Sequence, residues 1–243
     1  MTAARRKPAP SPVAPVAADD AALSPSLRAL AYERFRKAIL GGQLRAGQFV
    51  SQRELVQLLD VPLGAVREMI PRLEAARLLL TVPKRGLQIA HIDLKLIRNA
   101  FQVRAMIERE AVQHYVRSVS DAELEEEERK HRAVLERALS GQPDARLDQD
   151  ALAVDWHLHD RMVDAMGNEI LSEIYRVNSL HVRMIRLDAQ QVRPQRVVPA
   201  MEEHLRFIAL LKARDEAGAV KAMQEHVEQS RQRVLNAMLQ HGG

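Results

Sequence analysis

Four side chains of metal-ligating type stand at spacings that could bring them together: Asp155, His159, His204 and His226. Asp155 and His159 lie four residues apart in the run DWHLHD, so on a helix both side chains project from one face. His204 and His226 are each eleven residues from Asp215, which lies in the turn-like run ARDEAG. In an antiparallel helical hairpin these two imidazoles would stand at the same height. One carboxylate and three imidazoles form a ligand set for a divalent ion such as Zn, Ni, Mn or Fe.

Each of these residues also has an ordinary structural explanation. Asp155 and His159 match an i, i+4 ion pair on a solvated helix face. His204 follows two glutamates on a polar face, and His226 could pair with Glu225 or Glu228. Taken together, the spacings favour a metal site over four separate explanations. The histidines without such convergence are interpreted as structural: His114, His131, His157 and His181.

Length and composition restrict the classes of protein. A chain of 243 residues can form one large domain or two smaller ones, each with a core. The absence of cysteine excludes disulfides, thiolate metal sites and a cysteine nucleophile. A cytoplasmic location, which we expect, is compatible with this absence. No apolar run approaches the roughly 18 residues of a membrane span, so we expect no membrane association. Residues 1–24 are rich in Pro and Ala and lack the apolar core of a secretory signal, which predicts a disordered tail.

Charge is distributed unevenly along the chain. Residues 28–92 hold 11 Lys and Arg against 5 Asp and Glu, a net charge of +6. Residues 93–243 hold 22 against 25, a net charge of −3. A basic unit beside a mildly acidic one favours a polyanionic partner for the first unit only, although a solvated basic face would have the same composition.

Residues 25–92 have the pattern of a winged helix-turn-helix. A helix over 29–40 ends at Gly41-Gly42, and Ser51 with Glu54 forms a capping box that opens a second helix through about residue 59. Helical spacing returns over 66–80. The run TVPKRGLQIA then predicts a basic β-hairpin with its turn at 83–86. In a winged helix-turn-helix, the second helix of the turn motif enters the major groove of DNA.

Residues 93–243 show helical periodicity without a convincing strand. The expected helices cover about 94–117, 121–140, 147–166, 169–187, 198–213 and 215–240. Six such helices predict an all-α bundle, so the whole chain is expected to be mainly α.

In this order, the motifs resemble those of GntR-family transcriptional regulators, in particular the FadR-like subgroup with a C-terminal FCD ligand-binding domain. In the first unit the resemblance rests on AYERFRKAILGGQLRAGQFVSQRELVQLLDV, VRE at 66–68, RLEAARLL at 72–79 and Arg85-Gly86. In the second unit it rests on Arg104, Glu108, Asp155, His159, Gly167-Asn168, His204 and His226.

The resemblance implies a double-stranded DNA operator as partner, contacted by Arg53, Arg67, Arg85 and Gly86. Arg53 opens the first helix of the turn motif, close to the DNA backbone. Arg67 lies in the first turns of the recognition helix, where a guanidinium reaches guanine O6 and N7 or a phosphate.

Three departures from the family pattern fall in the recognition helix. Members usually carry a Ser/Thr-Arg-Thr-Pro-like run where this chain has Pro62-Leu63-Gly64-Ala65, so a base-reading arginine and hydroxyl donors are absent. Pro71 removes a helix hydrogen bond and should kink the helix. Arg77 replaces a glycine of the family motif. We expect DNA binding with unusual or weak sequence preference, with a module that no longer binds DNA as the alternative.

For the second unit, the resemblance implies a small organic or sugar acid as effector and a homodimer as the functional form. The effector carboxylate would complete the coordination of the metal, and Arg104, at the position of the family's anion-binding arginine, would pair with its remaining charge. A surface or helix-pairing role for Arg104 is the alternative. Asn178 is a further candidate for the effector pocket, on helical position alone.

The sequence thus predicts a ligand-responsive, metal-binding transcriptional regulator and not an enzyme. A rival hypothesis is a metal-dependent enzyme with a vestigial DNA-binding module, because the same ligands with open positions could activate water. The lack of an obvious spare carboxylate or histidine on the same helix faces disfavours it. A third hypothesis, a metal-free domain for an apolar ligand, is disfavoured by the four polar residues.

Overall fold

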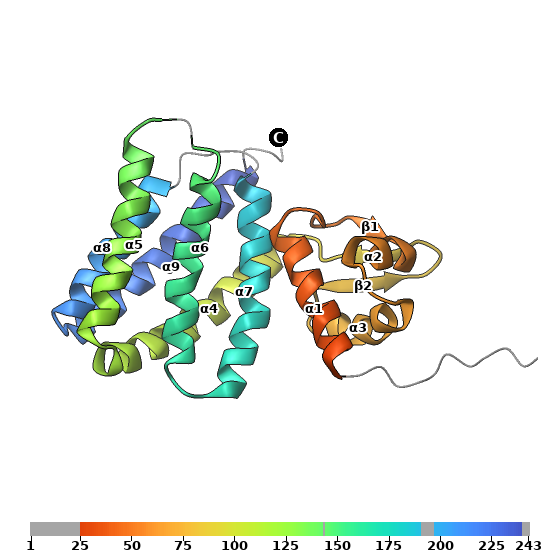
Figure 1. Ribbon diagram of the computed structural model, residues 1–243, viewed down its shortest axis with the longest axis horizontal. Helices are drawn as coiled ribbons and strands as arrows, with labels where there is room; N and C mark the ends of the chain where they lie inside the picture. The colour runs from red at the N-terminus through yellow and green to blue at the C-terminus, as the bar shows by residue number, and fades with distance from the viewer. Residues whose placement is uncertain (1–24, 143, 191–196, 240–243) are drawn as a thin grey trace, which may run out of the picture.

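The computed structural model describes residues 25–142, 144–190 and 197–239 and is mainly helical, as expected (Figure 1). The tail predicted over 1–24 lies outside the described residues. A small unit of helices and strands stands beside a larger helical bundle. No helix of the described residues is long and apolar enough to cross a membrane.

The small unit is a winged helix-turn-helix, as predicted. It consists of α1 (Pro25–Leu40), β1 (Phe49–Val50), α2 (Gln52–Leu59), α3 (Leu63–Ala75), β2 (Leu79–Val82) and β3 (Gly86–Ile89). The strands form an antiparallel sheet in the order β1-β3-β2. Ser51 and Glu54 form the expected capping box at α2. Strand β1 has only two residues, too few for an alternating pattern to predict it from the sequence.

Helix α3 differs from the helix predicted over 66–80. It begins at Leu63 and ends at Ala75, and it continues without interruption through Pro71. Arg77 follows with a positive φ of 55°, and the Leu78 amide donates to the Leu73 carbonyl. This left-handed residue turns the chain out of the helix, so the following leucines belong to β2. Periodicity alone could not separate them, since buried leucines suit a helix and a strand equally.

The bundle consists of the six predicted helices, with ends that differ by a few residues. They are α4 (Leu94–Ser118), α5 (Asp121–Leu139), α6 (Leu147–Asp164), α7 (Glu169–Gln190), α8 (Val197–Lys212) and α9 (Glu216–Leu239). Asp93 and Ser120 cap the first two through hydrogen bonds from the amides of Leu96 and Glu123. Helix α4 packs between α7 and α9, and α5 packs on α8.

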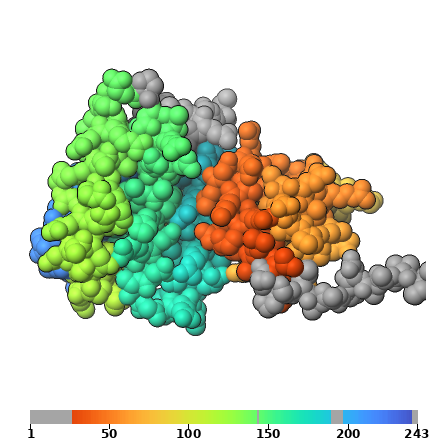
Figure 2. Space-filling model, viewed as in Figure 1, coloured from red at the N-terminus to blue at the C-terminus, as the bar shows by residue number. Residues whose placement is uncertain are grey.

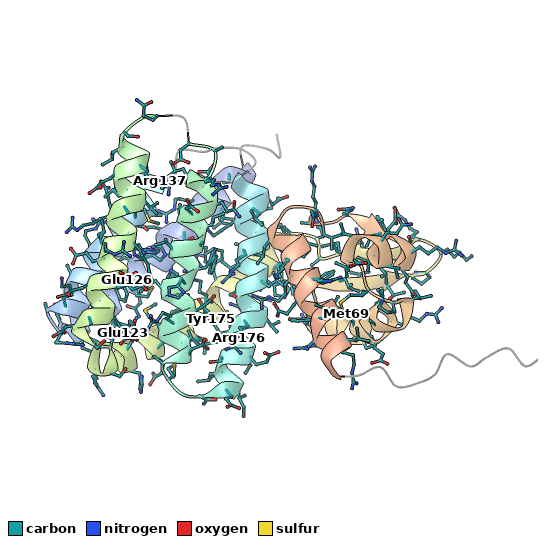
Figure 3. The ribbon with its side chains drawn as sticks, in the orientation of Figure 1. Met69, Glu123, Glu126, Arg137, Tyr175 and Arg176 are labelled. Carbon is teal, nitrogen blue, oxygen red and sulfur yellow. The ribbon has the colours of Figure 1, made fainter. Side chains whose placement is uncertain are left out.

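Helix α7 joins the two units because opposite faces of it are buried in different cores. Its Leu180 and Met184 belong to the core of the winged unit, whereas Tyr175 and Ile185 belong to the core of the bundle. Figure 3 shows Tyr175 between bundle helices and Met69 in the winged unit. In addition, His181 Nε2 lies 2.9 Å from the carbonyl oxygen of Ala76, at the end of α3. A shift of α7 would therefore act on the recognition helix directly.

Candidate metal centre

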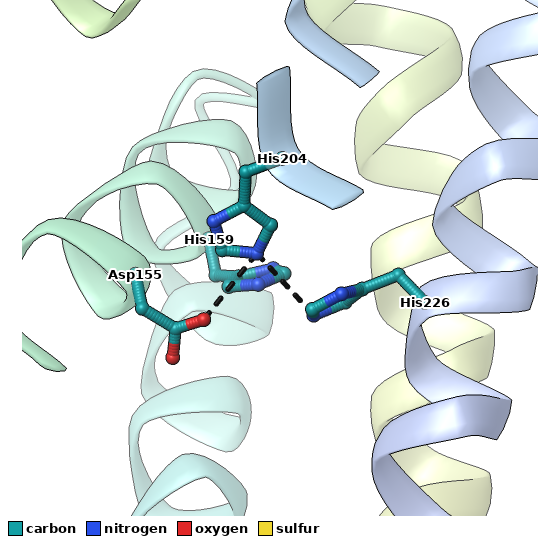
Figure 4. A group of neighbouring side chains, drawn as sticks. All are labelled: Asp155, His159, His204 and His226. Carbon is teal, nitrogen blue, oxygen red and sulfur yellow. Dashed lines mark hydrogen bonds and ion pairs between the residues drawn. The ribbon is translucent and has the colours of Figure 1, made fainter. Parts of the chain in front are cut away.

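The four predicted ligands converge inside the bundle (Figure 4). Asp155 and His159 project from α6, His204 from α8 and His226 from α9. One donor atom from each lies within 4.8 Å of the others. His204 Nε2 lies 3.3 Å from Asp155 Oδ1 and 3.4 Å from His226 Nε2. His204 and His226 therefore stand side by side on the hairpin of α8 and α9, as their equal distances from Asp215 predicted.

These residues fit a divalent ion on two observations. Donors about 2.0–2.1 Å from one ion lie about 2.9–3.4 Å apart at octahedral or tetrahedral angles, close to the separations of the nearest pairs here. All four residues are buried, and Asp155 Oδ1 has no hydrogen-bond partner among the described residues. A buried carboxylate oxygen without a partner is costly in a metal-free protein, and a metal ion would compensate it.

The imidazoles of His204 and His226 are oriented by hydrogen bonds from their Nδ1 atoms, on the side away from the other ligands. His131 Nδ1 lies 2.7 Å from the Glu127 carbonyl oxygen, so it carries a proton and leaves Nε2 as an acceptor. His204 Nδ1, 3.1 Å from that Nε2, must then be the donor, which leaves His204 Nε2 with a free lone pair toward the other ligands. In the same way, His226 Nδ1 donates to Glu203 Oε2 at 2.7 Å. Such outer contacts fix the tautomer that a metal ligand needs.

Arg104 lies directly at this centre and is completely buried, which excludes the surface alternative. Its Nε donates to Glu108 Oε1 at 2.7 Å, and its Nη2 lies 2.9 Å from His159 Nε2. The Tyr175 hydroxyl donates to the same carboxylate oxygen at 2.6 Å. Arg104 Nη1 has no partner among the described residues, so one cationic N–H group remains for a ligand.

The charge states match what a metal requires. Burial raises the pKa of the Asp155 carboxyl, but the charge of Arg186, the largest opposing effect, helps to hold that pKa well below its usual value. Burial, followed by the nearby His226 ring, lowers the pKa of His204 well below its usual value. Burial lowers the pKa of His226 to about 4, although its bond to Glu203 opposes the shift. At neutral pH Asp155 is thus a carboxylate and His204 and His226 are neutral imidazoles, the forms that bind metal.

Asn178, the other predicted effector residue, uses its amide elsewhere. Its Nδ2 donates to the Ala100 carbonyl oxygen at 3.0 Å, which ties α7 to α4 one turn before Arg104. A different residue of α7, Arg186, reaches the centre, because its Nη1 donates to Asp155 Oδ2 at 2.5 Å. The structure therefore brings together Arg104 and the four ligands, and it adds Arg186.

Sequence reasoning overlooked the outer residues of the centre. His131, interpreted as structural, lies against His204, and Glu203 rather than Glu225 is the partner of His226. His131 contacts the main-chain carbonyl of Glu127, which any residue would offer, and nothing in the sequence placed α5 beside α8. Glu108 on α4 and His131 on α5 are also buried beside the centre, on helices that carry none of the four predicted ligands.

Family comparisons establish which class of protein carries this centre. The model of the FCD domain matches residues 99–229, more than half of the chain. The model of bacterial regulatory proteins of the gntR family matches residues 27–89. The chain belongs to the GntR family, with an FCD domain. This GntR regulator is therefore a transcriptional regulator, and the enzyme hypothesis fails on its family membership rather than on any shortage of polar groups.

Relatives of this GntR regulator are regulators as well. It is 27% identical over 208 residues to the HTH-type transcriptional regulator BphR of Paraburkholderia xenovorans, with 84% of each chain covered. It is 26% identical over 192 residues to the Nta operon transcriptional regulator of Aminobacter aminovorans, covering 79% of this chain and 86% of the other. The structure of E. coli McbR/YncC has the same fold, with a TM-score of 0.71 and 18% identity over 88% of this chain and 98% of that one.

The residues predicted to contact DNA lie on the surface of the winged unit. Arg53 on α2 and Arg67 on α3 are exposed, and Arg67 Nε lies 3.4 Å from Gln52 Oε1. At the wing, the Arg85 guanidinium stacks on the Phe49 ring at 4.1 Å. Gly86 has a positive φ of 97°, and a Cβ there would lie 3.3 Å from the Val50 carbonyl oxygen. The wing turn therefore depends on glycine at this position.

The recognition helix begins without a side-chain cap. Its N-cap residue is Pro62, whose side chain offers no hydrogen-bonding group, and Leu63 and Gly64 follow in the first turn. The amide groups of the first turn have no helical partner and carry the positive end of the helix dipole, a suitable contact for phosphate. This end of α3 therefore suits contacts from its main-chain amides to DNA phosphates better than contacts from its side chains to bases.

Proposed function

We propose that this GntR regulator is a metal-dependent sensor of a small organic or sugar acid, of the FadR-like subgroup. The convergence of Asp155, His159, His204 and His226 in a buried centre supports this proposal most directly. Imidazole and carboxylate ligands suit Zn, Ni, Mn or Fe equally well. Arg186 holds the outer oxygen of Asp155, so that the inner oxygen faces the other ligands.

The effector is expected to be bound by residues that the centre leaves unsatisfied. When bound, the metal supplies open coordination positions for a carboxylate group. The free Nη1 of Arg104 offers a charge-assisted hydrogen bond to the same molecule, and a bond of this type is about twice as strong as a neutral one. An acid with a second polar group suits this arrangement better than a purely apolar ligand. Asn178 stays a candidate for the wall of the pocket.

We assign DNA binding to residues 25–92 and ligand sensing to 93–243, with a homodimer as the functional form. Arg53, Arg67, Arg85 and Gly86 form the expected contact surface for a duplex. The net charge of +6 over 28–92 supports a salt-dependent interaction with DNA.

Helix α7 is the proposed connection between the two functions. Arg186 on α7 contacts the metal ligand Asp155, and His181 on the same helix contacts the end of α3 at Ala76. An effector that alters the Asp155–Arg186 pair would move a helix that is already part of the winged unit. The coupling then takes the form of a population shift between two dimer geometries.

The test is a linkage measurement with a duplex selected from random DNA by the purified protein. Its affinity is measured with and without saturating lactate, citrate or gluconate, for the wild type and for Asp155→Asn. We expect an acid to change wild-type DNA affinity by about 5–150-fold, the usual range of allosteric coupling. Asp155→Asn should bind DNA normally without responding to acid.

Asp148→Asn is the matched control, because it makes the same change at an exposed residue of the same helix. It should respond to acid as the wild type does. An equal acid response in Asp155→Asn and the wild type would contradict the proposal, and so would a wild type that responds to no acid in the metal-loaded form.

A further inference from the structure

A cleft of about 530 Å³ lies outside the bundle core, where the winged unit meets the bundle. One wall is the end of α1, with Lys37 and Leu40, and the other is formed by α6 and α7. In Figure 2 the red-orange surface of α1 meets the green-to-teal surface of these two helices. The volume falls in the usual range for small-molecule sites, about 300–1,000 Å³.

The floor of the cleft is an aromatic ring with cations stacked on it. Trp156 is almost fully buried, and the guanidinium groups of Arg183 and Arg186 lie 4.4 Å and 5.2 Å from its ring centre. Both arginines line the cleft, and leucines of both units form its apolar walls. The lining therefore combines apolar surface with positive charge, a combination that suits a molecule with an apolar body and an anionic end.

The charges of the cleft are only partly compensated. Arg183 pairs with Asp160 at 2.7 Å, and Arg186 pairs with Asp155. No carboxylate of the described residues lies within ion-pair distance of Lys37. In addition, Arg183 Nε and Asp160 Oδ1 are buried and have no hydrogen-bond partner among the described residues. A buried donor without a partner is unfavourable, and a ligand that offers an acceptor, such as a carboxylate, would satisfy Arg183 Nε.

We infer that this cleft is a second ligand site, separate from the metal centre, for an amphipathic carboxylate such as an aryl-alkanoic or medium-chain acid. Its carboxylate pairs with Lys37 and the guanidinium of Arg183, and its apolar body lies against Trp156 and Leu187. Because Lys37 belongs to α1 and the other residues to α6 and α7, an occupant contacts both units at once. It would thereby hold the winged unit in one position on the bundle, independently of the metal.

Trp156 makes the test direct, since it is the only tryptophan of the chain. Its fluorescence is followed while the full-length protein is titrated with 3-phenylpropionate, octanoate and the neutral amide 3-phenylpropionamide. We expect a saturable change with at least one acid and none with the amide. Lys37→Glu replaces an attraction with a repulsion at an exposed position and should weaken acid binding about fivefold or more.

Two further variants locate the response. Lys95→Glu makes the same charge change at an exposed lysine that does not line the cleft, and it should bind acid within twofold of the wild type. His204→Ala together with His226→Ala removes two metal ligands and should also leave the acid response in place. This outcome would assign acid binding to the cleft and not to the metal centre. If the proposed metal centre were wrong, the metal content of the protein would show it, and the acid response would not.

Three results would overturn the inference. They are the absence of a saturable change with both acids, equal acid binding by Lys37→Glu and the wild type, and a response that disappears in the double histidine variant while Lys37→Glu keeps it. The last result would assign the acid to the metal centre.

Discussion

His131 and His204 form a pair of imidazoles that joins α5 to α8, with 3.1 Å between His131 Nε2 and His204 Nδ1. Both rings are completely buried, and burial lowers the pKa of each. The pair ends at the carbonyl oxygen of Glu127, so its protons can be arranged in only one way while both rings are neutral. A residue outside the ligand set therefore determines which nitrogen of His204 is available to a metal.

His131→Leu should lower metal affinity about 10- to 100-fold, the usual effect of removing an outer-shell partner of a metal ligand. The leucine removes the acceptor that holds His204 Nδ1–H, so His204 loses its fixed tautomer. Affinity is measured by competition with a chromophoric chelator. His114→Leu, at an exposed position of α4, is the control and should bind metal like the wild type. Unchanged affinity of His131→Leu would show that the pair has no role in ligation.

Arg77→Gly should raise the free energy of unfolding by about 0.5–1 kcal/mol. Arg77 is exposed, has a φ of 55°, and its side chain forms no hydrogen bond or ion pair within the described residues. Relief of the left-handed strain, about 1–2 kcal/mol, exceeds the added chain entropy of glycine, about 0.5–1 kcal/mol. Urea denaturation followed by circular dichroism provides the measurement.

Arg214→Gly is the contrasting variant, because Arg214 has the same φ of 55° but a bonded side chain. Its Nη1 donates to the carbonyl oxygens of Val116 and Val119. The loss of these bonds should make Arg214→Gly less stable than the wild type. Stabilisation by both substitutions, or by neither, would contradict the account of Arg77.

Because of His181, we expect the free energy of unfolding to decrease at acidic pH. Burial is the largest cause that lowers the pKa of His181 below 6.5, and the nearby Arg77 acts in the same direction, whereas the bond to Ala76 opposes it. Below pH 6.5 the unfolded chain thus binds more protons at this residue than the folded chain, so the free energy of unfolding decreases as pH falls. One proton contributes at most about 1.4 kcal/mol per pH unit.

His181→Gln keeps a donor for the Ala76 carbonyl but does not titrate. The midpoints of urea denaturation of both proteins are compared at about pH 7.5 and about pH 5.5, on either side of the ordinary histidine pKa. The wild type should lose more stability than the variant. Other buried histidines titrate in both proteins, so only the difference between them reports on His181. Parallel losses would show that His181 keeps an ordinary pKa.

Arg67→Ala should weaken duplex binding by about 1–3 kcal/mol if its guanidinium reads a base. Arg67 is exposed on α3 and has only a long contact to Gln52, so it is available to DNA. Gel-shift titrations of the variant and the wild type at two salt concentrations distinguish base reading from a phosphate contact, because a phosphate contact also changes the salt dependence. Equal affinity of the two proteins would remove Arg67 from the interface.

The winged unit and the helical bundle could be predicted because their signals are local. The capping box of Ser51 and Glu54, the basic hairpin and six amphipathic segments each occupy a short stretch of chain. The end of α3 was missed, although Arg77 stands where the family motif has glycine, the residue that usually takes such a left-handed conformation.

The metal centre was predictable for a similar reason. Helical spacing relates Asp155 to His159, and a single turn relates His204 to His226, so only two local relations were needed. His131 was out of reach because its partner lies 73 residues away on another helix. Arg186 was overlooked because a guanidinium at the end of a long helix has no pattern of its own.

The metal content of the protein tests the account most directly. The full-length wild type, purified without chelators and loaded with divalent metal where needed, is compared by elemental analysis with His204→Ala together with His226→Ala. We predict a stoichiometric divalent ion in the wild type and none in the double variant. His114→Ala together with His157→Ala, two exposed histidines, should keep the ion. A folded wild type that contains no metal and cannot be loaded, or a double variant that retains it, would contradict the central claim.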